Sequence, residues 1–136
     1  MSLDHNLGSS QWSVVAVSLE GTSHQKHDLP CQDAHFWQVV GDRILVAGVA
    51  YGAGSVSLSE VGSLLAVQTA VKGVASKITE SSIPDSDEGW KVLLNSGLED
   101  ALAALQAEAE LRQINVRELS TTLLIVVATP DIVAAI

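Results

Sequence analysis

The sequence predicts an α+β fold, in which the strands are grouped apart from the helices. Short runs rich in β-branched and other apolar residues lie towards both ends of the chain, as expected for strands. Between them, apolar residues recur at intervals of three and four, which is typical of amphipathic helices. This order favours an antiparallel sheet layered against helices over alternating βαβ units. The length, 136 residues, fits one compact domain.

The N-terminal part is expected to hold one strand between two polar segments. Residues 1–11 are polar and contain Gly and Ser, so we expect this segment to be loose and the domain to span 12–136. The segment 12–19 (WSVVAVSL) predicts a strand, and the apolar residues on both of its faces predict that it is buried. The polar segment 21–32, which contains Pro30, predicts a loop.

The remaining strands are expected in a hairpin and at the end of the chain. Segments 36–40 and 43–50 predict the hairpin, with Gly41-Asp42 as a turn of type I′ or II′. The segment 121–128 (TTLLIVVA) predicts a buried strand, and 132–136 the start of another. Because the sequence ends within this last strand, we expect it to be truncated. The uncovered sheet is then expected to produce a homo-oligomer.

Two helices are expected in the centre of the chain. The first covers 57–78, and its start is placed at Ser57 because Glu60 follows three residues later in a capping-box pattern. The second extends from Trp90 to about Arg112, with a candidate break or kink at Asn95-Ser96-Gly97. An acidic, solvated loop is expected between the two helices.

Composition and charge exclude several classes of function. The 16 acidic residues outnumber the 7 basic ones, and the net charge of −9 argues against binding to nucleic-acid phosphates. The apolar run 123–128 is far too short to span a bilayer, and no secretory signal pattern is visible. The single cysteine, Cys31, excludes an intramolecular disulfide and suits a reducing compartment. A cytoplasmic protein without membrane contact is therefore expected.

A polar cluster lies around the segment expected as a loop. It contains His24, His27, Asp28, Cys31, Asp33 and His35. These are zinc-ligand types, but their spacing matches no common structural zinc pattern, and we favour an ordinary polar loop over a zinc site. Cys31 is likewise either a nucleophile activated by a histidine or a buried, inert thiol, and we favour the second interpretation.

The segment Gly52-Ala53-Gly54-Ser55 lies between an expected strand and an expected helix, which is the setting of a phosphate-binding loop. The dinucleotide pattern would need a glycine where Ser57 stands, and the P-loop pattern would need a lysine. We therefore favour a tight turn with a close backbone approach.

Several short motifs follow one another along the chain. They are Gly21-Thr22-Ser23-His24, Leu29-Pro30-Cys31-Gln32-Asp33-Ala34, Val49-Ala50-Tyr51-Gly52-Ala53-Gly54-Ser55, Ser59-Glu60-x-Gly62 and Ser120-Thr121-Thr122-Leu123. In order and spacing they resemble the bacterial branch of the protein phosphatase 2C family, which are metal-dependent Ser/Thr phosphatases of signal transduction. The resemblance covers about residues 12–136.

The resemblance implies an α/β/β/α sandwich of two antiparallel sheets flanked by helices, of which this chain is expected to hold roughly the N-terminal half. It also implies a binuclear Mn²⁺ or Mg²⁺ centre that activates a water for hydrolysis of a phosphorylated protein substrate. By position, Asp33 would be the catalytic acid near the metals and would hold metal-bound water. Gly52 would offer its backbone carbonyl to one metal.

Two residues depart from the family's pattern. Tyr51 stands where the family has its metal-bridging Asp, and a neutral phenol cannot replace a carboxylate between two divalent cations. Glu20 stands near the place of a phosphate-binding Arg and would repel phosphate. We therefore expect a fragment of a protein phosphatase 2C-like Ser/Thr phosphatase domain that binds metal weakly and is inactive as given. The alternatives are a non-catalytic pseudophosphatase or protein-interaction module, and an unrelated α+β domain whose motifs match by chance.

Overall fold

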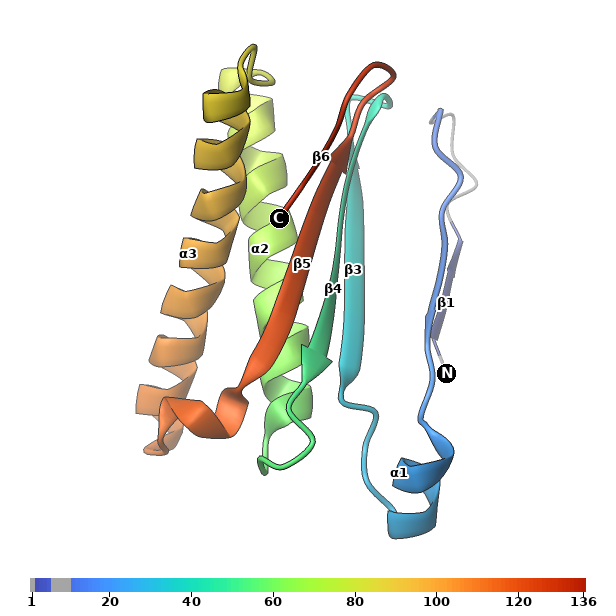
Figure 1. Ribbon diagram of the computed structural model, residues 1–136, viewed down its shortest axis with the longest axis vertical. Helices are drawn as coiled ribbons and strands as arrows, with labels where there is room; N and C mark the ends of the chain where they lie inside the picture. Colours follow the sequence, from blue (N-terminus) through green and yellow to red (C-terminus); the bar gives the residue numbers. More distant parts are fainter. Residues whose placement is uncertain (1, 6–10) are drawn as a thin grey trace.

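The computed structural model describes residues 2–5 and 11–136, with only the backbone at residues 2–5 and His24. Two long helices, a central four-stranded sheet and a two-stranded sheet form three layers (Figure 1). The elements are β1 (Ser2–His5), β2 (Val15–Ser18), α1 (Thr22–His27), β3 (Asp33–Val40), β4 (Ile44–Gly52), α2 (Ser59–Ser81), α3 (Asp87–Arg112), η1 (a 3₁₀ turn, Val116–Leu119), β5 (Thr121–Ala128) and β6 (Val133–Ala135). The predicted α+β class is confirmed.

The central sheet is antiparallel throughout, in the order β3-β4-β5-β6. The predicted hairpin is present as β3–β4, and Gly41 and Asp42 in its turn both have a positive φ, 56° and 59°. The register pairs Val40 with Ile44, so three residues, 41–43, connect the strands instead of the two that were predicted. Alternate residues from Val46 to Gly52 are buried, whereas Val49 and Tyr51 lie on the opposite face and are exposed. The sheet therefore has an inner face against the helices and an outer face towards β2.

The core lies between the inner face of the sheet and α2. Small and β-branched side chains form the buried face of this helix: Ala66, Val67, Ala70, Val71, Val74 and Ala75. Gly48 of β4 allows α2 to approach closely, because a Cβ at this position would lie 2.9 Å from Val67 and 3.1 Å from Val71. Val46, Ile125 and Val127 of the sheet belong to the same core.

The second long helix, α3, packs against α2 without interruption. Because α3 is one helix from Asp87 to Arg112, the candidate break at Asn95-Ser96-Gly97 is wrong, and the alternative of a kink there stays a prediction. A Cβ at Gly97 would lie 2.8 Å from Val74 and 3.0 Å from Ile125, so this glycine serves close packing. The helix begins before Trp90, at Asp87, because the Ser86 hydroxyl caps it by accepting the Gly89 N–H at 3.1 Å.

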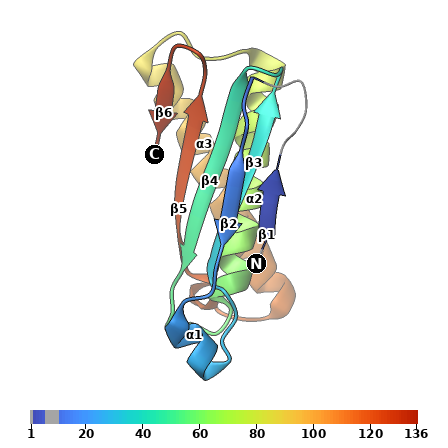
Figure 2. The same cartoon turned by 90° about the vertical axis from the view of Figure 1, so that its right-hand side faces the viewer.

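The strands β1 and β2 form a separate layer over the outer face of the central sheet (Figure 2). A hydrogen bond of 2.8 Å between Ser18 Oγ and His35 Nδ1 links β2 to β3. Neither α1, inside the expected loop 21–32, nor β1 was predicted, and β1 exists because it pairs with β2 along that strand's whole length. The expectation of a loose segment over 1–11 thus differs from the structure at 2–5. At residues 1 and 6–10 it falls outside the described residues.

Over residues 2–5 and 11–136, no helix is both long and apolar enough to span a membrane.

We predict that Gly62 of α2 tolerates no side chain. A Cβ there would overlap the backbone carbonyl oxygen of Leu119 in η1, and backbone cannot move aside as a flexible side chain can. Gly62→Ala should lower the free energy of unfolding by at least about 2 kcal/mol in chemical denaturation. Gly21→Ala is the matched control, because nothing lies within 4 Å of a Cβ at Gly21. Equal losses from the two substitutions would contradict the close packing of α2 on η1.

Candidate functional site

Asp33 and Tyr51 lie opposite each other on β3 and β4. They are partners in the strand register, and Thr122 of β5 continues the same row. Register partners share one face of an antiparallel sheet, so all three residues lie on the outer face. The Tyr51 N–H donates to Thr122 Oγ1 at 3.3 Å, and its carbonyl accepts from Thr121 Oγ1 at 3.0 Å. The backbone of Tyr51 is therefore fixed while its side chain, 58% exposed, is open to solvent.

Gly52 follows Tyr51 on β4 and is closely surrounded. Its N–H donates to the carbonyl of Gln32 at 3.0 Å. A Cβ at Gly52 would lie 2.8 Å from the carbonyl oxygens of both Gln32 and Ser59, so only glycine fits this position. The structure thus brings Asp33 and Gly52, the two residues singled out by the resemblance, to the same end of the β3–β4 pair.

The turn from β4 to α2 is held by a residue far along the chain. The helix begins at Ser59, and its N-cap residue Leu58 provides no side-chain cap. The Ser57 hydroxyl instead donates to Glu118 Oε2 at 2.7 Å, and the Ser57 N–H approaches the same oxygen at 3.3 Å. The predicted capping box with Glu60 is therefore wrong. Hydrogen bonds from the Ser57 hydroxyl and N–H hold the pKa of the Glu118 carboxyl below its usual value.

An open cavity of about 370 Å³ lies beside Asp33 and Tyr51. Its apolar wall comes from Val17, Leu19, Val49 and Leu124, and its polar groups include Ser18, His35 and Thr122. Among the described residues that line this cavity there is no Lys or Arg, so a phosphate group would meet no cation in it.

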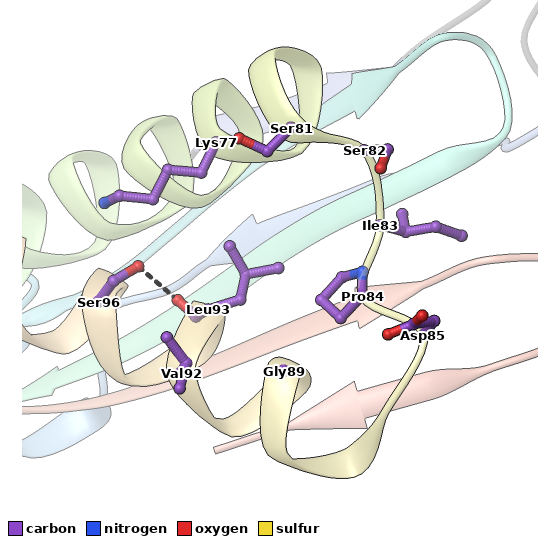
Figure 3. Close-up of a pocket in the computed structure, with 10 residues that line it drawn as sticks. All are labelled: Lys77, Ser81, Ser82, Ile83, Pro84, Asp85, Gly89, Val92, Leu93 and Ser96. Atoms are coloured by element: carbon purple, nitrogen blue, oxygen red, sulfur yellow. Dashed lines mark hydrogen bonds between the residues drawn. The ribbon is translucent and has the colours of Figure 1, made fainter.

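A larger cavity, of about 710 Å³, lies where α2 turns into α3 (Figure 3). Lys77, Pro84 and Leu93 are among its lining residues, but none of the residues predicted from the sequence as site residues lines it. Another cavity, of about 530 Å³, also borders Asp33, but Tyr51 does not line it. The cavity of about 370 Å³, which both Asp33 and Tyr51 line, is therefore the candidate functional site.

The polar cluster of the 24–35 segment is spread over separate positions. Cys31 is a free, half-buried thiol whose Sγ lies 3.6 Å from the carbonyl oxygen of Asp33. His27 is exposed on α1, His35 is linked to Ser18, and the side chain of His24 lies outside the described residues. No zinc site is assembled from the described members of this cluster.

The donor set at the candidate site consists of one carboxylate, Asp33, and the backbone carbonyl of Gly52. In the described part of the chain, no group of three or more His, Cys, Asp and Glu side chains is placed to hold a metal ion. A centre of two divalent cations needs several carboxylates to neutralise it. The described residues therefore do not by themselves fit a binuclear Mn²⁺ or Mg²⁺ centre.

Two buried polar residues beneath the β4–α2 turn were not predicted as part of the site. Gln32 Oε1 and Ser59 Oγ are both buried without a hydrogen-bond partner. Both residues pack around Gly52, and Gln32 Oε1 also lies 3.4 Å from where a Cβ at Gly54 would stand. Burying these two oxygens without a hydrogen-bond partner costs free energy. The close packing around Gly52 must therefore be favourable enough to offset that cost. Nothing in the local sequence marks these side chains as buried.

We predict that Ser57→Ala raises the pKa of Glu118 towards its usual value. The pKa of Glu118 is lower in the folded than in the unfolded state, so the stabilisation is present above the unfolded pKa and lost as the pH falls through the folded pKa. The variant should therefore be less stable than the parent chain near pH 7, and the difference should shrink towards about pH 3. Carboxyl NMR titration and denaturation at the two pH values measure both effects. Ser55→Ala, at an exposed serine of the same turn, is the control. An unchanged Glu118 pKa in Ser57→Ala would contradict this assignment.

The amino-acid sequence is similar to those of known proteins. Residues 20–136 match the family described as protein phosphatase 2C. The chain is 36% identical over 124 residues to Serine/threonine-protein phosphatase 3 of Escherichia coli (strain K12), covering 88% of this chain and 47% of the relative. It therefore spans about half the length of that relative. No solved structure gives a significant match. The chain belongs to the protein phosphatase 2C family, as its ordered motifs predicted.

Proposed function

We propose that this chain supplies the Asp33 end of a protein phosphatase 2C-type Ser/Thr phosphatase domain and has no metal-dependent phosphatase activity by itself. One observation carries the proposal: Tyr51 lies directly across from Asp33, at the position that the family resemblance assigns to the metal-bridging carboxylate. Tyr51 supplies no carboxylate, whereas a bridge between two divalent cations needs negative charge. Asp33 is then left without the second carboxylate of the pair.

The charge around the cavity supports the same conclusion. A phosphorylated protein substrate would bring a strongly negative group, which needs Arg, Lys or metal partners. The described lining residues include Asp33 but no Lys or Arg, and Glu20 is exposed just after β2. With a net charge of −9, the chain as a whole also repels anions. Without bound metal, phosphate binding at Asp33 is therefore unfavourable.

The alternative function is a non-catalytic pseudophosphatase or protein-interaction module. The observation that favours it is the apolar wall of the same cavity, formed by side chains of β2, β4 and β5. Such a surface suits a protein partner better than a phosphate group. A role in signal transduction and a cytoplasmic location are part of this proposal, and the free thiol of Cys31 suits a reducing compartment.

We predict that the purified chain hydrolyses p-nitrophenyl phosphate and a phosphoserine peptide at the background rate, with Mn²⁺ or Mg²⁺ present at millimolar concentration. The reason is the missing negative charge at position 51. Steady-state assays with and without EDTA measure the metal-dependent rate of hydrolysis. Mn²⁺-dependent turnover that co-purifies with the chain and disappears with EDTA would contradict the proposal.

We also predict that Tyr51→Asp tightens Mn²⁺ binding by less than about tenfold and leaves turnover at background, because Asp33 and one new carboxylate remain too few for two cations. Tyr51→Asn is the matched control, since it has nearly the shape of Asp without the charge. Calorimetric titration compares the three proteins. Equal Mn²⁺ affinity in the Asp and Asn variants would show that position 51 does not face a metal site.

A further inference from the structure

One short segment supplies hydrogen-bond partners along the turn from β4 to α2. The turn comprises residues 53–58. The segment, residues 118–122, covers the end of η1 and the start of β5, and η1 lies beside the beginning of α2 (Figure 1). The carboxylate of Glu118 accepts from the Ser57 hydroxyl at 2.7 Å and from the Ser57 N–H at 3.3 Å. A side chain of the distant segment thus meets the turn just before α2 begins.

Backbone groups of the same segment hold both ends of the turn. The Ala53 N–H donates to the carbonyl of Ser120 at 3.0 Å, and the Leu58 N–H donates to the carbonyl of Glu118 at 3.1 Å. Within the turn, the Val56 N–H donates to the Ala53 carbonyl at 3.1 Å. The first and the last residue of the turn are therefore both held by partners far along the chain.

The segment that holds the turn is itself fixed. Leu119 is fully buried, and its carbonyl packs against α2. The Asn115 side chain caps η1 by accepting the Arg117 N–H at 3.0 Å, and the Ser120 hydroxyl donates to the Arg117 carbonyl at 2.7 Å. Because these contacts leave η1 little freedom, Glu118 presents its carboxylate from a rigid element.

The turn, by contrast, has little apolar packing of its own. Leu58, the N-cap residue of α2, provides no side-chain hydrogen bond to the helix. None of the turn residues is fully buried, and three are exposed: Gly54, Ser55 and Ser57. A segment with few buried apolar contacts opens at a low cost in free energy. Hydrogen bonds to the 118–122 segment, rather than core packing, therefore decide whether the turn stays closed.

The direction of the Gly52 carbonyl depends on the first residue of the turn. The Gly52 C=O and the Ala53 N–H belong to one peptide unit, which is planar and trans, so the two groups point in opposite directions. The hydrogen bond from the Ala53 N–H to Ser120 therefore also sets the direction of the Gly52 C=O.

We propose that Glu118 is a positioning residue for the candidate site: its carboxylate keeps the 53–58 turn closed, and the closed turn fixes the direction of the Gly52 carbonyl. Hydrogen bonds to an ionised acceptor are roughly twice as strong as those to a neutral one. The carboxylate also lies near the N-terminus of α2, where the helix dipole favours negative charge. That the Gly52 carbonyl is a metal ligand rests on the proposed function, whereas its positioning does not.

NMR of the whole chain tests the proposal. Residual dipolar couplings in two alignment media measure how the Gly52–Ala53 peptide unit is oriented relative to the sheet, averaged over motions up to milliseconds. In Glu118→Ala, the Ala53 N–H coupling should fall by at least about a third, because the released unit samples more than one orientation. Couplings of Val46 and Val71, in the core, should stay unchanged. Glu118→Gln keeps an acceptor oxygen without the charge and should show a smaller change.

The matched control is Glu99→Ala. Glu99 is exposed in the middle of α3, so the same substitution there should leave all of these couplings unchanged. Parent-like Gly52–Ala53 couplings in the Glu118 variants would overturn the proposal, even with a lower free energy of unfolding, since a contact that only stabilises the fold gives that result. So would equal changes in Glu99→Ala, or changes as large in the core.

Glu118→Gln decides the test if Glu118→Ala does not fold. The couplings need neither bound metal nor phosphatase activity. This proposal can therefore fail while the proposed function stands, and the reverse.

Discussion

The close packing of α2 against β4 is the constraint on which the rest of the fold depends. It requires glycine at Gly48, where a Cβ would meet Val67 and Val71. The packing of the same helix on η1 requires glycine at Gly62, where a Cβ would overlap the Leu119 carbonyl. Because small and β-branched residues cover this side of α2, the helix lies flat on the sheet and presents its other side to α3. Removing water from these surfaces is the main source of stability in a domain of this size.

The same packing determines the geometry of the candidate site. The start of α2 presses against Gly52, and this contact, with the hydrogen bonds between Ser57 and Glu118, fixes the turn that ends β4. The strand register then places Tyr51 across from Asp33 on the outer face. The backbone around the site thus matches the family's motifs, but Tyr51 has a phenol where the family resemblance implies a negatively charged carboxylate. A local substitution at position 51 can alter the chemistry while the scaffold is kept, because its side chain is exposed and makes no core contact.

Elements defined by local pattern were predictable from the sequence, and contacts between distant residues were not. The β-branched run of β5 and the Gly41-Asp42 turn are local signals, and the structure has a strand and a turn at these positions. The expectation that the whole strand is buried is wrong, because Leu124 is 56% exposed. Gly97 was mistaken for a break, because its reason for being glycine is the distant side chain of Ile125. The capping-box prediction was wrong for the same reason. The Ser57 hydroxyl donates a hydrogen bond to Glu118, 61 residues away, instead of interacting with Glu60. The ordered motifs predicted the family and identified Asp33 and Gly52 as candidate site residues. The burial of the Gln32 and Ser59 side-chain oxygens could not be predicted, because no local sequence pattern indicates it.

The claim that Tyr51 leaves the Asp33 site without a metal centre is tested most directly by Mn²⁺ binding to the unmodified chain. Electron paramagnetic resonance measures free hexaaquo Mn²⁺, whose sharp signal disappears when the ion binds protein. With the chain at 100 μM and Mn²⁺ titrated from 10 to 400 μM, the account predicts that the signal follows that of a protein-free control, because one carboxylate and one carbonyl bind a divalent cation only weakly. Loss of signal equivalent to two Mn²⁺ ions per chain with micromolar affinity would contradict it.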